Sequence, residues 1–446
     1  MYRSAVSFRS KLARLEGNVP REDAAPAATR ETANAEAAPP ARPAVLDALR
    51  ARMRSILERA MPGPAPPRAV DTPDLPFTTT ETESGPLHLR RIALSPAHRT
   101  GRHPILPART ASPSLLALLA LDPSLAACDP AGALYLDTET TGLAGGTGTV
   151  AFLVGLARWE ESELVLEQVL VRNLGEEAPM LEHVAARMAD ASMLVTFNGK
   201  SFDLPLLRTR FVMARIAPPR ELPHLDLVHV ARRLHKRRGL ECKLTSLERD
   251  LLGFVRHDDV ASGDVSACYL HFLRTGDTTT LLGVIEHNAW DVVAMAALVG
   301  LYGEPLEGSQ LDPNDLVGLA RTLRRAGAVD DALDAVNLAV GRGAGHDSLR
   351  ARAEIAKARG DRARALADYA ALVEQVDDPS ARLELAKLYE HFAKDPARAL
   401  DVVTSGTNEA ADASERRAER LRRKAARALV QPTLFGTKKH GKSPRP

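Results

Sequence analysis

The stretch Ala133-Leu-Tyr-Leu-Asp-Thr-Glu-Thr-Thr-Gly142 limits the possible folds of this chain more than any other. Residues 134–136 form an apolar run that is typical of a buried strand, and Asp137 and Glu139 stand at its end. Because residues i and i+2 of a strand point to the same face, both carboxylates should face one cavity. Two like charges side by side are unfavourable unless a cation joins them, and a divalent metal is the simplest such cation. The alternative is a pair of solvated acids where the strand ends.

The segments after this strand predict a mixed α/β layer fold. Residues 150–159 and 164–171 have the pattern of two more strands, and residues 177–189 that of an amphipathic helix. Residues 193–197 then form another buried strand. A meander of strands followed by strand–helix units is the order of a sheet with helices packed on it.

Composition divides the chain into four parts. A length of 446 residues suggests about two to four domains. Residues 1–84 are predicted to be largely disordered around a short helix at 44–61, because their proline-rich and Ala/Glu/Pro-rich stretches bury too little apolar surface. We expect the α/β domain at 85–303, an all-α helical-repeat domain at 312–428, and a disordered basic tail at 429–446.

Cysteine spacing and hydropathy limit the cellular context. Cys128, Cys242 and Cys268 fit no zinc-binding spacing and indicate reduced thiols in a cytoplasmic protein. No segment approaches ~18 uninterrupted apolar residues, so we predict no membrane span. The net charge of +2 points to no class of partner.

A glycine-rich stretch, residues 141–148, follows the central strand. It is not a phosphate-binding loop, because no helix pattern comes after it. Two interpretations stay open. The glycines form a hairpin that needs positive φ, or their bare backbone lets a substrate chain approach the two acids.

Further acids follow in Phe197-Asn-Gly-Lys-Ser-Phe-Asp203. A helix should begin here with Ser201 as its N-cap, and Asp203 should lie in the first turn, where the helix dipole favours negative charge. Lys200 is either solvated or faces a phosphate. Asp226 is expected to cap another helix or to support the site indirectly.

The last polar pair lies on a helix predicted around residues 281–298. His287 and Asp291 are four residues apart, so they share one helix face. The buried stripe of this helix is expected to contain Ile285, Val292, Met295 and Leu298.

Together these motifs resemble the DEDD exonuclease superfamily, and within it the YprB-type branch. The similar motifs are Asp137-Thr-Glu-Thr-Thr-Gly-Leu-Ala-Gly-Gly-Thr-Gly148, Asn198-Gly-Lys-Ser-Phe-Asp203, Lys243-Leu-Thr-Ser-Leu-Glu248 and His287-Asn-Ala-Trp-Asp291. The resemblance covers residues 85–303 and implies a ribonuclease H-like mixed sheet flanked by helices. It also implies metal-dependent 3′→5′ hydrolysis of single-stranded DNA or RNA.

The resemblance further implies roles for individual residues. Two Mg²⁺ or Mn²⁺ ions are expected on Asp137, Glu139, Asp203 and Asp291, where two-metal catalysis would hold both reacting oxygens. His287 is expected to act as the base, and the substrate is expected to contact Thr138, Asn198, Lys200 and Phe202. In the family, the last motif has either Tyr separated from the Asp by three residues or His separated by four. His287 has the tyrosine-type spacing.

The C-terminal third carries a repeat. Ala332-Leu333, Ala365-Leu366 and Ala399-Leu400 recur at spacings of 33 and 34, and Gly327, Gly360 and Lys394 keep the same period. This period resembles tetratricopeptide-like helical hairpins. Such an array binds a protein partner or supports the nuclease domain by packing; the sequence leaves both open.

The tail contains Gln431-Pro-Thr-Leu-Phe435, which resembles the bacterial sliding-clamp-binding pentapeptide. Gln431, Leu434 and Phe435 would dock in a groove of the clamp, which would raise the effective concentration of the nuclease at DNA.

Two classes of function remain. The first is a metal-dependent exonuclease with appended repeats, and the alternative is a non-catalytic nucleic-acid- or protein-binding scaffold. The presence of all four acids favours the enzyme, because a pure binder does not need them together.

Overall fold

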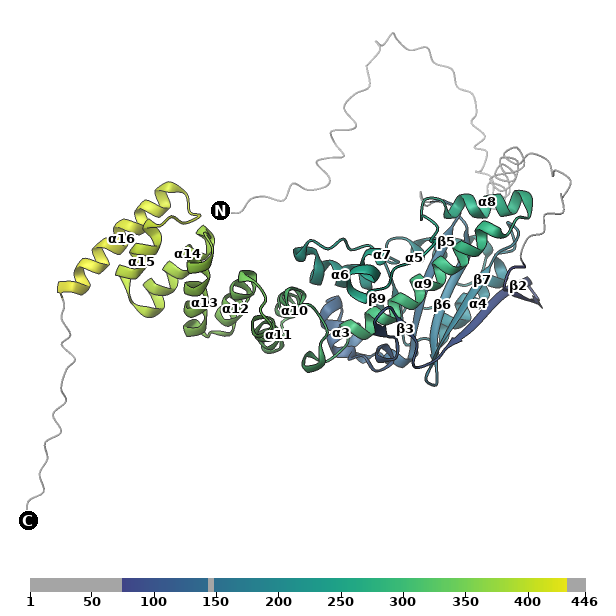
Figure 1. Ribbon diagram of the computed structural model, residues 1–446, viewed down its shortest axis with the longest axis horizontal. Coiled ribbons are helices and arrows are strands. Elements are labelled where there is room, and N and C mark those ends of the chain that lie inside the picture. Colours follow the sequence, from purple (N-terminus) through teal and green to yellow (C-terminus); the bar gives the residue numbers. More distant parts are fainter. Residues whose placement is uncertain (1–73, 143–147, 431–446) are drawn as a thin grey trace, which may run out of the picture. The chain divides into compact units, whose positions relative to one another are not determined.

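The computed structural model describes residues 74–142 and 148–430 (Figure 1). Its main sheet has seven strands in the order β1-β2-β7-β6-β5-β8-β9. The strands are β1 (Thr78–Thr82), β2 (Gly85–Leu94), β5 (Ala133–Thr140), β6 (Ala151–Glu160), β7 (Glu163–Leu170), β8 (Met193–Thr196) and β9 (His224–Asp226). The pairs β1–β2, β2–β7, β7–β6 and β6–β5 are antiparallel, whereas β8 is parallel to both of its neighbours, β5 and β9. Two short strands, β3 (Arg99–Thr100) and β4 (His103–Pro104), pair separately.

Helices cover both faces of the sheet, so the predicted mixed α/β class is confirmed. The helices α4 (Ala178–Asp190) and α5 (Asp203–Ala214) pack on one face, and α9 (Thr279–Tyr302) packs on the other. Strand alternation sorts the side chains of β5 between these faces. Leu134 and Leu136 join the cluster with α4 and α5, whereas Tyr135 joins the cluster with α9. The same alternation directs Asp137 and Glu139 towards α9.

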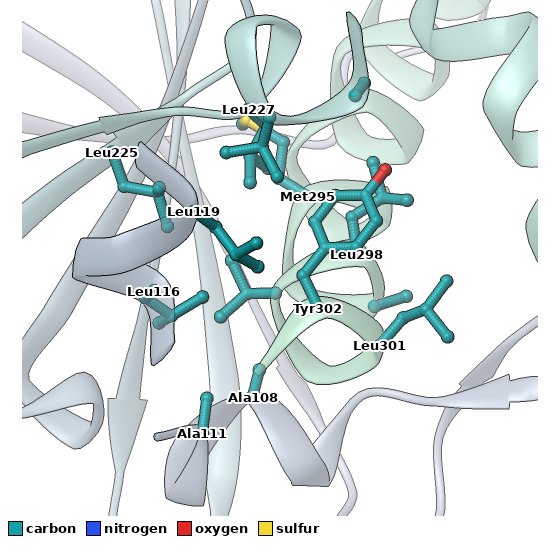
Figure 2. Packing of buried hydrophobic residues seen from close by; sticks show 14 of the residues in the cluster. Ala108, Ala111, Leu116, Leu119, Leu225, Leu227, Met295, Leu298, Leu301 and Tyr302 are labelled. Carbon is teal, nitrogen blue, oxygen red and sulfur yellow. The ribbon is translucent and has the colours of Figure 1, made fainter. Parts of the chain in front are cut away.

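The remaining helices of this region complete the core around α9. They are α3 (Pro113–Ala120), α6 (Leu227–His235), α7 (Leu244–Leu247), a π-helical turn at Glu248–Leu252, and α8 (Val265–Thr275). Short 3₁₀ turns occupy Leu106–Thr110, Pro123–Ala127, Pro130–Gly132, Lys236–Arg238 and Leu306–Gly308. Figure 2 shows Leu116, Leu119, Leu225 and Leu227 packed near Met295, Leu298 and Tyr302 of α9. The predicted stripe of α9 is confirmed, since Ile285, Val292, Met295 and Leu298 are all fully buried.

One described helix, α9, is long and apolar enough to pass as a membrane span by length and composition. However, 72% of its most apolar window is buried inside the protein. It packs on β5, β6 and β7 as the central helix of the core.

The structure corrects several predicted boundaries. The sheet begins at β1, inside the region expected to be disordered, because the threonines of this strand pair with β2 along its whole length. The N-cap of α5 is Phe202 rather than Ser201, and no side chain caps it.

Several predictions lie outside the described residues. They are the helix at 44–61, most of the glycine-rich loop at 143–147, and the pentapeptide with Gln431, Leu434 and Phe435.

The C-terminal region is a run of packed helices, as predicted. They are α10 (Pro313–Arg325), α11 (Val329–Gly341), α12 (His346–Arg359), α13 (Arg362–Gln375), α14 (Pro379–Leu388) with a π-helical turn at Tyr389–Ala393, α15 (Pro396–Thr404) and α16 (Ala411–Val430). Each helix packs on the next along the chain.

The residues that mark the sequence period occupy equivalent places in these helices. Ala332, Ala365 and Ala399 stand at the fourth position of α11, α13 and α15, and all three are fully buried. The other markers, Gly327, Gly360 and Lys394, precede the same helices with φ of 89°, 93° and 57°. The period therefore reflects close packing at a small side chain and a left-handed turn between helices.

The packing continues from the α/β region into α10, across the boundary drawn between residues 303 and 312. The buried His235 of α6 has Nε2 2.9 Å from the Tyr302 hydroxyl and Nδ1 3.0 Å from Asp315 Oδ1 of α10. Arg238 Nη1 lies 3.1 Å from Asp315 Oδ2. At Gly318 the two helices approach so closely that an added Cβ would overlap the Leu234 carbonyl oxygen. The first helix of the array is therefore part of the same core.

We expect Gly318→Val to lower the free energy of unfolding by about 1–3 kcal/mol, as overpacking of a tight interface does. Chemical denaturation followed by circular dichroism measures this change. The matched control is Gly341→Ala at the end of α11, where an added Cβ meets nothing within 4 Å. Equal stability of the two variants would contradict the close packing of α10 on α6.

Candidate active site

The five predicted catalytic residues line one cavity of about 260 Å³ at the end of β5. Asp137 and Glu139 come from β5, Asp203 is the first residue of α5, and His287 and Asp291 come from α9. Acids from three distant segments are thus brought together. Strand alternation explains the first pair, and the spacing of four residues on α9 explains the last.

Asp137 is held by a chain of hydrogen bonds that crosses the sheet. Arg90 Nη1 donates to Gln168 Oε1 at 3.0 Å, and Gln168 Nε2 donates to Asn288 Oδ1 at 2.9 Å. Asn288 Nδ2 then donates to Asp137 Oδ2 at 2.9 Å. Because a guanidinium can only donate, Arg90 fixes the orientation of both amides. The Asp137 carboxylate therefore receives an N–H from the fully buried Asn288.

A glycine makes this chain possible. Gly155 of β6 pairs with Asp137 on one side and with Gln168 on the other. A Cβ at this position would overlap Asn288 Oδ1 and lie 2.8 Å from Val292 Cγ2. Only glycine lets α9 come close enough for Asn288 to reach Asp137.

Asp203 is fixed from the opposite face of β5. Thr138 points towards α5, and its hydroxyl donates to Asp203 Oδ1 at 2.5 Å. Phe202, the preceding residue, is 60% exposed and lines the same cavity. Thr138 and Phe202 therefore lie where a substrate can touch them.

The other two predicted substrate residues do not line this cavity. Asn198 has a left-handed backbone with φ of 70°, and its N–H donates to Asp226 Oδ1 at 2.7 Å. The Lys200 N–H donates to Asp226 Oδ2 at 3.0 Å, while its side chain lines a separate groove of about 630 Å³. Asp226 also accepts from the Val228 N–H, so its predicted role as an N-cap is confirmed.

His287 is oriented by a residue that the sequence analysis missed. Its Nδ1 lies 2.7 Å from Asp259 Oδ1, and its Nε2 lies 3.5 Å from Asp291 Oδ2. A carboxylate can only accept, so Nδ1 carries the hydrogen in this pair. In the neutral ring Nε2 is then the free acceptor, and it lies on the side of Asp291 and the cavity.

In the described part of the chain, Arg256 is the one arginine or lysine within hydrogen-bonding distance of Asp291 and Asp259. Its side chain is only 5% exposed. It donates twice to Glu248, at 2.7 Å each, and once to Asp291. Its guanidinium also lies 3.3 Å from Asp259 and 5.5 Å from the Trp290 ring centre. Arg256 and Asp259 come from an irregular segment, residues 253–264, whose sequence gives no periodic signal.

Two comparisons with known proteins agree with this geometry. A family profile described as RNase_H superfamily matches residues 134–302, from β5 to the end of α9. The chain is also 30% identical over 306 residues to Uncharacterized protein YprB of Bacillus subtilis (strain 168). That alignment covers 66% of this chain and 73% of the relative.

Residues 134–302 form an RNase H superfamily domain, and the chain belongs to the same family as YprB. The predicted ribonuclease H-like fold and the similarity to YprB are therefore confirmed. Proteins with the RNase H fold are typically nucleases that use divalent ions, so nucleic acid is the substrate class that this fold implies.

The electrostatics of the cavity fit a divalent cation. Desolvation, Asp291 and Glu139 raise the pKa of Asp137 well above its usual value. Desolvation, Asp291 and Asp203 raise the pKa of Glu139 to about 8, and desolvation raises that of Asp203 to about 6. The carboxyls thus repel one another more than the protein compensates. Ligand atoms of Glu139, His287 and Asp291 lie within 4.8 Å of one another, close enough to share one ion.

We expect the metal-free protein to lose stability as pH rises from 6.5 to 8. The pKa values of Glu139, about 8, and Glu248, about 7, exceed their unfolded value near 4.5, so the folded state holds more protons in this window. Buried histidines with lowered pKa act in the opposite direction, but only below pH 6.5. Thermal unfolding in EDTA measures the slope.

Saturating Mn²⁺ should raise the unfolding temperature more at pH 8 than at pH 6.5, since the ion competes with protons for the same oxygens. At 100 times the dissociation constant, the gain is about 2.7 kcal/mol. Glu139→Gln should flatten the slope in EDTA and reduce the Mn²⁺ effect. An unchanged slope in that variant would contradict the assignment of the titrating group.

Proposed function

We propose that this chain is a metal-dependent 3′→5′ exonuclease of the DEDD type that hydrolyses phosphodiester bonds of single-stranded nucleic acid. One observation carries the proposal. Asp137, Glu139, Asp203, His287 and Asp291 face a single cavity in a chain of the RNase H superfamily. The direction of hydrolysis comes from the resemblance of the four acidic motifs to that exonuclease class.

The four carboxylates would hold two Mg²⁺ or Mn²⁺ ions, which when bound supply an activated water and charge compensation at the leaving oxygen. The chain's own residues prepare the ligands. Asn288 and Thr138 each donate one hydrogen bond to a ligand carboxylate, to Asp137 and to Asp203. Arg256 does the same for Asp291, so three of the four acids are positioned before any ion binds.

His287 would receive the proton of the attacking water on Nε2. Asp259 holds Nδ1–H and so selects the ring tautomer whose Nε2 is free. Histidine is the side chain most often used as a general base in proton transfer. Phe202 and Thr138 would contact the terminal nucleotide at the cavity rim.

Hydrolysis is tested with matched DNA and RNA oligonucleotides blocked at either end. With Mn²⁺, nucleotides should be lost only from free 3′ ends, and Asp137→Ala should abolish the loss because one ligand oxygen pair is removed. Asp190→Ala, an exposed acid on α4, is the control and should retain full activity. Equal degradation by Asp137→Ala would overturn the proposal.

Asp259→Asn should lower kcat by about 10²–10⁴ with little change in KM, as loss of a histidine-orienting carboxylate does in the serine protease triad. Asp258→Asn is the matched control: this neighbour is exposed and has φ of 57°, which Asn tolerates. Steady-state kinetics on a single-stranded oligonucleotide measures both. A kcat for Asp259→Asn equal to that of the control would show that Asp259 does not position the base.

The helices α10–α16 are proposed to be tetratricopeptide-like, on the basis of the equivalent positions of Ala332, Ala365 and Ala399. Their protein partner, the clamp-binding role of Gln431, Leu434 and Phe435, and the cytoplasmic location stay predictions. The scaffold alternative is disfavoured because a set of poorly compensated carboxyls destabilises a protein that only binds.

A further inference from the structure

Six of the seven cations of α16 fall into two sets with different surroundings; the seventh, the exposed Arg422, lies about 120° from Arg416 around the helix and belongs to neither set. The first set anchors the helix. Glu390, whose side chain is fully buried, lies 2.9 Å from Arg420 Nη2, 2.8 Å from Lys424 Nζ and 3.4 Å from Arg417 Nη1. Arg417 also donates twice to Glu409, at 2.8 Å each. Together with buried Ala418 and Leu421, these contacts explain how α16 packs on the array.

The second set points to solvent. Arg416, Arg423 and Arg427 are exposed, and among the described residues none of them has an ion pair within 4 Å. At 3.6 residues per turn, positions i, i+7 and i+11 lie within about 40° of one another on the helix surface. A rise of 1.5 Å per residue spreads them over about 16 Å. We call these three arginines the α16 stripe.

The helix does not need the α16 stripe for its own stability. Like charges one turn apart on a helix repel by a few tenths of a kcal/mol per pair, and Arg420 of the anchoring set stands between members of the stripe. Glu415 and Glu419 lie on its flank without forming an ion pair in the described structure. The three arginines have no ion-pair partner within the described structure, so binding of a polyanion would relieve the repulsion between the cations of this helix.

The chemistry of the stripe favours a phosphate backbone over a protein surface. Planar guanidinium groups bind phosphate with paired N–H donors, and a straight row matches regularly spaced phosphates. Protein interfaces instead centre on apolar or aromatic anchors. The exposed large apolar residues of the described chain are Phe202, Val212, Val255 and Phe392, and none of them belongs to α16.

We propose that the α16 stripe binds the phosphate backbone of the single-stranded nucleic acid on which the chain acts. The site adds affinity and carries no base specificity, since phosphate contacts do not read sequence. The inference rests on the proposed function for the identity of the polyanion, and it deepens that function by adding a second contact to the substrate outside the catalytic cavity.

The test is binding of labelled 40-nucleotide DNA and RNA to the full chain carrying Asp137→Ala, in EDTA, so that no hydrolysis occurs. The triple variant Arg416→Gln/Arg423→Gln/Arg427→Gln should weaken binding on the order of 10- to 100-fold near 0.1 M salt. Its plot of log K against log salt should be shallower by about 2, since each single-strand phosphate contact contributes about 0.7.

The matched control removes the same charge elsewhere. Arg325, Arg362 and Arg364 are exposed residues of α10 and α13, and their triple change to Gln should alter affinity and salt slope much less. Equal losses in both triples would overturn the proposal, because net charge alone would then explain the effect. If the stripe triple unfolds, the single change Arg423→Glu is measured instead and should weaken binding relative to Arg362→Glu.

Two further arms separate this inference from the proposed function. The first arm measures hydrolysis in Mn²⁺ by the stripe triple with Asp137 restored. This variant should hydrolyse a trinucleotide at the same rate as the unsubstituted chain, and a 40-nucleotide strand more slowly at low substrate concentration. If the unsubstituted chain hydrolyses neither substrate but the stripe triple still binds nucleic acid more weakly, the result supports binding by the stripe and overturns the proposed exonuclease activity. Competition by polyglutamate as effective as that by DNA of equal charge would overturn the choice of nucleic acid and indicate an acidic protein instead.

Discussion

Mutual repulsion of carboxyl groups at the end of β5 is the constraint on which the rest of the active-site structure depends. Asp137, Glu139, Asp203 and Asp291 meet where water is scarce, and the pKa of Asp137 and Glu139 rises for that reason. Carboxyl groups this close together become protonated or move apart unless each group is held in place. The fold holds three of them with donors, from Asn288, Thr138 and Arg256, and leaves part of their charge uncompensated within the described structure.

The donors themselves have to be oriented, and the sheet does this. Arg90, Gln168, Gly155 and Asp137 lie in one row across neighbouring strands. Buried amides in an apolar core cost free energy unless every N–H and C=O is paired. Here Gln168 also donates to the Ile285 carbonyl at 2.7 Å, so the row and α9 satisfy each other. The polar row therefore ties the position of α9 to that of the strand that carries Asp137 and Glu139.

The parts of the site that follow a local period could be predicted from the sequence. The two-residue period of β5 put Asp137 and Glu139 on one face, and the helical period put His287 beside Asp291. The residues that support them could not be predicted in this way. Asn288 and Asp137 are 151 residues apart, and no spacing encodes that contact.

The residues whose roles were predicted wrongly, and those that were not predicted at all, also depend on contacts that no local period encodes. Asn198 and Lys200 contribute backbone N–H groups to Asp226, a role that their side chains do not reveal. Arg256 and Asp259 stand in a segment without regular structure, so neither a helical nor a strand pattern marks them. Their importance becomes visible only when the chain folds that segment against α9.

The spacing of His287 from Asp291 also has a structural explanation. Four residues on a helix turn through about 400°, so the two side chains point within about 40° of each other. A histidine five residues before Asp291 would point about 140° away and would need a different route to the cavity. At the shorter spacing the ring lies directly against Asp291, and Asp259 approaches it from the neighbouring segment to fix Nδ1. The orientation of a base at this position therefore depends on a partner outside α9, which links the chemistry of this site to the path of residues 253–264.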